Sequence, residues 1–178
     1  MKKIFLLTLL AIGFQSKAQL FMTTNGEVSI VSKTPMENID AVNKSVSSII
    51  NTATNEVAVQ MRITNFVFPN KLMQEHFNEN YMESERFPTT KFAGKIKEEV
   101  DLSKPGTYPV TAEGNLTIHG VTKPVQVKGT IVATATALQV NFSFQVRTAD
   151  YQIEVPTLVF DKIAETIAIS GKLNLLKQ

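Results

Sequence analysis

Side chains able to do chemistry are few in this chain, and the histidines are the first to consider. There are two, His76 and His119, and there is no cysteine, which excludes thiol nucleophiles and thiolate-bound metals. His76 lies near Glu75, Glu79 and Glu83, and a histidine with converging carboxylates can hold a divalent cation. Carboxylates on a helix more often form a solvated face. We therefore predict no metal site and no cofactor.

His119 lies in a tight turn between two runs of alternating apolar residues. The alternation that points Ile118 into the interior points His119 out of it, so we predict that His119 hydrogen-bonds the backbone of its own turn. The alternative is an enzyme in which His119, Asp150 or Tyr151 acts as acid or base on a bound substrate. Catalytic triads are defined by geometry, and the spacing here supports none. We predict that the protein is not an enzyme.

The two runs around this turn are the most informative stretch of the chain. Residues 114–130 read GNLTIHGVTKPVQVKGT, with Leu116 and Ile118 on one face of the first run. Val125 and Val127 share one face of the second run. Period-two alternation over so short a span is typical of half-buried antiparallel strands.

The same alternation predicts strands along most of the chain. The predicted strands are 26–33, 45–50, 56–66, 91–97, 138–147 and 165–175. Between them we expect loops at 36–43 and 101–109 and a turn at 52–55.

One segment has the period of a helix. The strand pattern breaks at residues 66–69, and Asn70 is a good N-cap for a helix over Leu72–Met82. Its apolar residues Met73 and Phe77 are four positions apart and face the same side.

These elements predict a mainly β fold, an antiparallel barrel of about eight strands with one short α-helix. The interior of such a barrel is either filled by side chains or holds one small ligand. Parity assigns Gly94, Gly129 and Gly171 to the inner face. Each glycine marks either a bend in its strand or a place left empty inside.

Three segments carry a resemblance to a known family. Residues 117–125 resemble the central signature of the YceI-like family, lipocalin-like bacterial proteins that bind polyisoprenoids. Residues 66–77 with Phe87-Pro88 resemble the strand-to-helix segment of that family, and residues 150–153 resemble its late Asp-aromatic-x-Ile element. The resemblance implies a lipocalin-like barrel whose ligand is a polyisoprenoid or an isoprenoid quinone, sequestered or carried.

The apolar residues expected inside the barrel are the candidates for contact with such a ligand. Each buried methylene contributes about 0.8 kcal/mol, so a long apolar chain binds with hardly a hydrogen bond. The candidate ligand-binding residues are Val59, Met61, Ile63, Phe66, Met73, Phe77, Phe92, Leu116, Ile118, Phe142 and Phe144. We expect the helix to cap the mouth. The alternative is a structural or stress-response barrel with a solid core and no lipid ligand.

The first residues predict a targeting segment. Residues 1–19 have a basic start, an apolar run over 4–14 that is too short to span a bilayer, and small residues at Ser16 and Ala18. We expect a cleaved secretory signal peptide, a single domain over residues 20–178, and a periplasmic location without a lipoprotein cysteine.

The charge balance bears on partners. Removal of residues 1–19 takes away three lysines and no acidic residue, which changes the net charge from +2 to −1. A nearly neutral chain argues against nucleic acid and against strong attraction to anionic membranes. We expect an apolar lipid as partner, no nucleic acid and no stable membrane insertion; a homodimer stays open.

Overall fold

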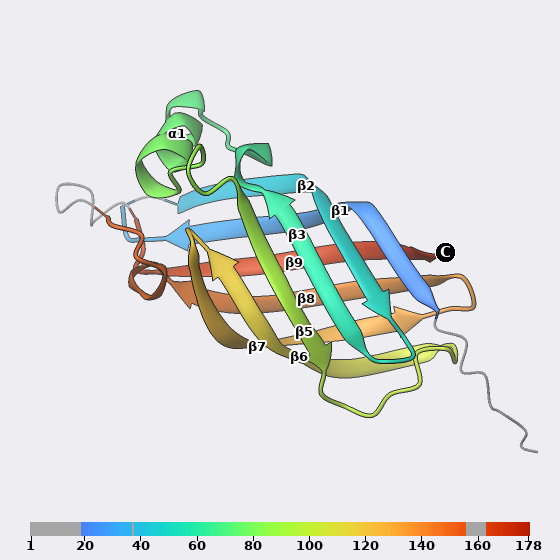
Figure 1. The fold of residues 1–178 in the computed structure, drawn as a ribbon. Coiled ribbons are helices and arrows are strands. Elements are labelled where there is room, and N and C mark those ends of the chain that lie inside the picture. The colour runs from blue at the N-terminus through green and yellow to red at the C-terminus, as the bar shows by residue number, and fades with distance from the viewer. Residues whose placement is uncertain (1–18, 37, 156–162) are drawn as a thin grey trace, which may run out of the picture.

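One antiparallel sheet that closes on itself dominates the structure (Figure 1). The computed structural model describes residues 19–36, 38–155 and 163–178. The strands in the described residues are β1 (Leu20–Lys33), β2 (Asn38–Asn51), β3 (Glu56–Arg62), β4 (Phe66–Val67), β5 (Thr89–Ile96), β6 (Gly106–Ile118), β7 (Val121–Ala133), β8 (Ala137–Arg147) and β9 (Thr166–Lys177). The helical elements are η1 (Ile63–Asn65), α1 (Lys71–His76), the π-helical η2 (Phe77–Tyr81) and η3 (Thr148–Tyr151).

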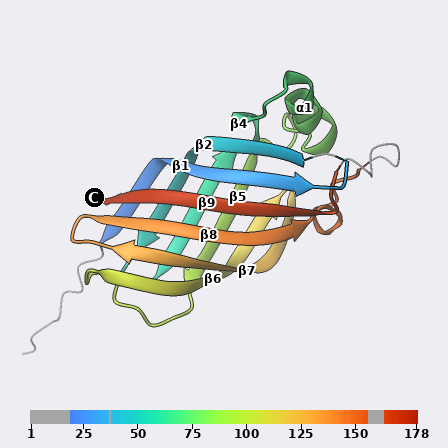
Figure 2. The same cartoon turned by 180° about the vertical axis from the view of Figure 1, so that it is seen from behind.

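The strand order explains the closure. Neighbours follow the order β1-β9-β8-β7-β6-β5-β3-β2, and β1 also pairs with β2. The two-residue β4 pairs with β2 at Val42 and Asn43, on the side of β2 that faces away from β1. Figure 2 shows β1, β9 and β8 side by side from behind. Closure leaves the eight long strands without an open edge, as the predicted barrel of about eight antiparallel strands requires.

The first two strands are longer than predicted. β1 begins at Leu20 instead of residue 26, and β2 begins at Asn38, so the predicted loop at 36–43 is wrong. Register shifts between Thr23 and Val28 break the alternation of β1, which hides its strand signal.

Polar residues hide the start of β2 in the same way. Asn43 is fully buried, where its Nδ2 donates to the carbonyl of Arg62 (2.9 Å) and its Oδ1 accepts from the amide of Ser45 (2.9 Å). A polar residue with both groups paired is tolerated inside a ladder. The predicted loop at 101–109 is also too long, because β6 already begins at Gly106.

The helical segment begins as predicted. Asn70 is the N-cap, and its side chain accepts from the amide of Leu72 at 2.8 Å. The α-helical part ends at His76, and π-helical turns continue to Tyr81. The segment lies over one end of the barrel (Figure 1). The strand predicted over 56–66 ends at Arg62 because η1 turns the chain there.

The opposite end of the barrel is packed solid, and we call it the closed end. Its side chains are almost fully shielded from solvent and come from several strands: Phe21, Val46, Leu138 and Leu175. Leu102 joins them from the loop between β5 and β6 and is 0 % exposed. We call residues 97–105 the plug loop, because this segment covers the closed end (Figure 1).

Candidate functional site

The barrel is hollow toward α1. A cavity of about 480 Å³ lies inside, lined by the inner faces of the strands and by Leu72, Met73 and Phe77 of the helical segment. Ligand pockets commonly span about 300–1,000 Å³, so the cavity is large enough to enclose a small molecule or part of a long one.

All eleven residues that the sequence predicts as ligand contacts lie on the wall of this one cavity. The strands contribute Val59, Met61, Phe66, Phe92, Leu116, Ile118, Phe142 and Phe144, η1 contributes Ile63, and the helical segment contributes Met73 and Phe77. The period-two alternation of the strands turns these side chains inward. The structure thus brings the set together, while its contact with a lipid stays a prediction.

The cavity wall includes further residues that the sequence analysis did not select. Ile167 and Ile169 of β9 line it, and their alternation was a signal that places them on the inner face. Val155 and Ile163 also line it. These two residues lie outside the strands, so no periodic pattern marks them.

Three phenylalanines fix the helical segment to the rim of the barrel. The ring of Phe77 lies 5.6 Å from that of Phe66, edge to face, and 4.8 Å from that of Phe68. Phe66 and Phe68 are buried, and all three rings line the cavity. Aromatic pairs in such geometry stabilise their contact beyond the area that they bury. The segment therefore caps the cavity through apolar contacts.

The polar side chains of the cavity are hydroxyl groups, one amide and one imidazole. They are Ser32, Asn70, His76, Tyr81, Thr90 and Thr148. Among the described residues that line the cavity there is no lysine, arginine, aspartate or glutamate. Burial raises the pKa of the Tyr81 hydroxyl above its ordinary value of 10.0, so this group stays a neutral hydrogen-bond donor at physiological pH.

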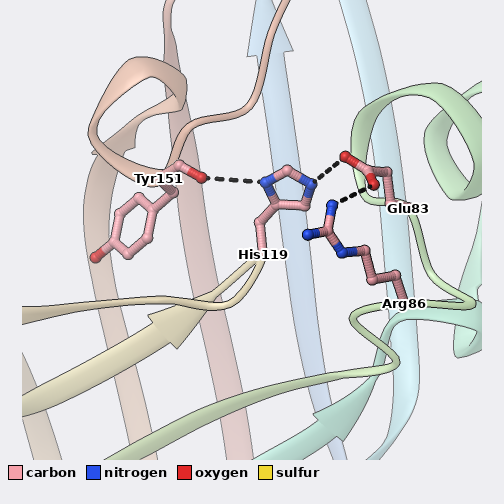
Figure 3. A network of polar contacts seen from close by, with 4 residues as sticks. All are labelled: Glu83, Arg86, His119 and Tyr151. Carbon is pink, nitrogen blue, oxygen red and sulfur yellow. Dashed lines mark hydrogen bonds and ion pairs between the residues drawn. The ribbon is translucent and has the colours of Figure 1, made fainter.

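His119 links two segments that are distant in the sequence (Figure 3). Its Nε2 lies 3.0 Å from Oε1 of Glu83, and its Nδ1 lies 3.2 Å from the carbonyl oxygen of Tyr151. The Phe87 ring packs edge-on against the imidazole at 4.6 Å. Glu83 also pairs with Arg86 at 3.3 Å.

The prediction that His119 bonds the backbone of its own turn is therefore wrong. The backbone of His119 has a φ of 51°, in the left-handed region, and Gly120 follows at 73°. This turn directs the imidazole away from the β6–β7 corner and toward Glu83 and Tyr151. Met82 directly precedes Glu83, Ile153 follows Tyr151 by two residues, and both line the cavity. His119 therefore ties two parts of the cavity wall together.

The residues of the alternative enzyme are not arranged around the cavity. His119, Asp150 and Tyr151 are absent from its lining residues, and both imidazole nitrogens of His119 already have partners. In the described part of the chain, no three His, Cys, Asp or Glu residues converge on a point where a metal ion fits. Within the same residues, no helix has the length and apolar character needed to cross a membrane.

The sequence matches a model of the YceI-like domain over residues 11–175, which is most of the chain. The chain belongs to the YceI-like family. Solved structures agree with this assignment at the level of the fold. This YceI-like chain shows no significant match to any curated protein sequence.

Three solved structures illustrate the likeness. A polyisoprenoid-binding domain from Saccharophagus degradans, implicated in plant cell wall breakdown, has a TM-score of 0.77 at 16% identity, covering 91% of this chain and 100% of that one. BcnA from Burkholderia cenocepacia has a TM-score of 0.68 at 17% identity, covering 85% of this chain and 95% of that one. The Campylobacter jejuni YceI protein has a TM-score of 0.62 at 14% identity, covering 76% and 83%.

Proposed function

We propose that this YceI-like protein binds the chain of a polyisoprenoid lipid in its barrel. The observation that carries the proposal is the apolar cavity of about 480 Å³, which a barrel with a solid core would lack. The polyisoprenoid-binding domain from Saccharophagus degradans has the same fold, which supports the ligand class. The structural or stress-response alternative gives no reason for the cavity.

The cavity wall suits a ligand held without directional contacts. Each methylene of a bound chain contributes about 0.8 kcal/mol when it leaves water. Met61, Met73 and Met82 lie on the wall, and their flexible thioethers adapt to a methyl-branched chain. Affinity in such a site comes from the length of chain enclosed.

We extend the proposal to the head group, which should be uncharged. A diphosphate enclosed by this wall would lack a lysine or arginine partner among the described lining residues, and an unpaired buried charge is costly. Asn70, His76 and Tyr81 offer hydrogen bonds from the helical segment. A quinone or a polyprenol fits these groups better than a polyprenyl diphosphate.

The remaining parts of the proposal concern role and place. A site that binds an apolar chain and presents no acid–base set to it favours carriage or sequestration over chemistry. The signal-like residues 1–19 support a role in the periplasm, where such lipids must pass between membranes.

The first experiment tests for the ligand directly. Native mass spectrometry and organic extraction are applied to the protein expressed with its own leader and purified from the periplasm. We expect about one lipid of isoprenoid mass per chain, with an uncharged head group. Protein that stays empty after incubation with both quinones and polyprenols would contradict binding, and a stoichiometric polyprenyl diphosphate would contradict the uncharged head group.

Matched variants place the ligand. Phe144→Asp and Met61→Asp put a carboxylate into the cavity wall and should abolish lipid retention. Gln145→Asp puts the same charge on the exposed outer face, one residue along β8, and should leave retention unchanged. Circular dichroism shows which variants are folded. Retention in folded Phe144→Asp would mean that the lipid lies elsewhere.

A further inference from the structure

We infer that Phe142 sets the free cross-section of the cavity, and that Gly171 makes this possible by holding the Phe142 ring against the barrel wall. The inference deepens the proposed function and rests on it for the nature of the ligand. It assigns a specificity-determining role to a pair of residues on neighbouring strands, β8 and β9.

The two directly opposed residues of the pair are in close contact. Phe142 is the register partner of Gly171 in the β8–β9 ladder. A Cβ atom built on Gly171 would overlap the Phe142 ring, and its three nearest atoms, Cζ, Cε1 and Cε2, all belong to that ring. The ring therefore lies flat over the backbone of Gly171, in the space that any other side chain would fill.

The residue on the other side of Phe142 shows what this position leaves free. Phe142 is also the register partner of Gly129 in β7. Gly129 lines the cavity, whereas Gly171 does not. The ring thus covers Gly171 and leaves Gly129 at the border of the cavity. The space directly over Gly129 is taken by the carbonyl oxygen of Asn141, 2.7 Å from a Cβ built there, so a ring displaced from Gly171 has to turn toward the centre of the cavity.

The two readings that the sequence left open for inner-face glycines do not apply to Gly171. The β8–β9 ladder runs through it without a register shift, so it marks no bulge, and the ring fills the place that it leaves empty. Gly94 differs from it. A Cβ there would come within 2.8 Å of both the Phe92 ring and the Gly114 Cα, so close approach of β5 to β6 already explains that glycine.

The consequence is a size filter in the middle of the wall. A methyl-branched isoprenoid has a larger cross-section than a linear acyl chain, and it needs the volume that Phe142 leaves free. Gly171→Ala adds a single methyl group whose three nearest neighbours are atoms of a side chain that can rotate. We expect the variant to fold, with its Phe142 ring turned into the cavity.

Affinity measurements on four proteins test the inference. The probes are decaprenol and the linear alcohol 1-hexadecanol, each titrated against wild type, Gly171→Ala, Gly171→Ala with Phe142→Leu, and Ser170→Ala. We expect Gly171→Ala to weaken the binding of decaprenol about tenfold or more, which corresponds to about 1.4 kcal/mol, and to weaken the binding of 1-hexadecanol less. Phe142→Leu shortens the displaced side chain and should restore decaprenol binding. Ser170 faces outward beside Gly171, so its variant should match wild type.

A crystal structure of Gly171→Ala reads the position of the ring without any lipid. The Phe142 ring should lie in the cavity, with β9 unmoved. A ring still flat against residue 171, accommodated by a shift of β9, overturns the inference, and so does a double variant as weak as Gly171→Ala alone. Wild type that binds neither decaprenol nor any quinone overturns the proposed function instead, and the ring position then decides the geometric claim by itself.

Discussion

The two ends of the barrel share strands and sequence pattern, yet one is solid and the other hollow. On the inner face of β9, Leu175 is 0 % exposed and lies outside the cavity lining, whereas Ile167 and Ile169 are half-buried and border the cavity. β8 repeats the contrast, with Leu138 at 0 % and Phe144 on the cavity wall. A residue that points inward is therefore not the same as a residue that is packed.

The difference lies in what closes each end. At the closed end, the plug loop inserts Leu102 among the strand side chains and completes a close-packed core. At the other end, the helical segment rests on Phe66 and Phe68 of the rim and leaves the space beneath it free. This division suggests that the closed end supplies most of the stability and the hollow end the binding.

The largest expected effect comes from cutting the same number of carbons from each end of one strand. Leu175→Ala leaves a void in the closed end and should lower the free energy of unfolding by about 2–5 kcal/mol. Ile169→Ala removes groups that already border a cavity, so its loss of stability should be clearly smaller. Urea unfolding of both variants measures this contrast.

Lipid affinity should reverse the order of the two variants. Ile169→Ala removes contact with a bound chain, whereas Leu175 lies outside the cavity lining and its truncation should leave the affinity of folded protein unchanged. Equal losses of stability, or weaker lipid binding by Leu175→Ala, would show that stability and lipid binding are not assigned to separate ends of the barrel.

An intermediate effect is expected where His119 ties the hollow end together. His119→Asn keeps a residue that tolerates the left-handed backbone but is too short to reach Glu83 and Tyr151. We expect a loss of about 1–2 kcal/mol, typical of hydrogen bonds removed at a partly buried site. Hydrogen exchange should rise in residues 82–87 and 148–153 and not in the plug loop.

The control for this prediction is Arg86→Ala. Arg86 is exposed and pairs with the same Glu83 carboxylate, but its removal leaves both contacts of His119 in place. Exchange that rises equally in both variants would assign the effect to Glu83 and not to the histidine.

Some of this architecture is readable from the sequence, and the rest depends on contacts across the barrel. The alternation in β8 and β9 placed Phe142, Phe144 and Ile169 inward because the period of a strand is two. It failed in β1, where register shifts interrupt the period. The alternation could not distinguish the packed end of the barrel from the hollow end, because Leu102 fills the closed end from a loop that has no periodic pattern.

The direction of the His119 side chain could not be predicted from strand alternation, for a different reason. Strand parity assumes extended backbone up to the turn, but the left-handed φ of His119 redirects its side chain. Its partners, Glu83 and Tyr151, lie more than thirty positions away on either side. Only the assembled barrel brings these three segments together.

The smallest expected effect is the pH dependence of the stability that the Glu98 carboxylate gives to the closed end. The plug loop is fastened where the amide of Lys97 donates to the carbonyl of Thr111 (2.9 Å) and the amide of Thr111 donates to the Glu98 carboxylate (2.7 Å). That bond from Thr111 holds the pKa of Glu98 below its ordinary value of 4.5. The native state therefore favours the ionised form of Glu98, and the bond is lost when the carboxylate is protonated.

The sign of the pH dependence follows from this shift. Stabilisation by Glu98 is fully present above about pH 4.5 and disappears as the pH falls through the lower native pKa. Glu98→Gln should thus be less stable than wild type at pH 7, and the gap should narrow by pH 3. Glu99→Gln, on an exposed neighbour in the same loop, is the control. A gap that stays constant between the two pH values would mean that the Glu98 carboxylate does not hold the plug loop, and that packing around Leu102 alone keeps the closed end shut.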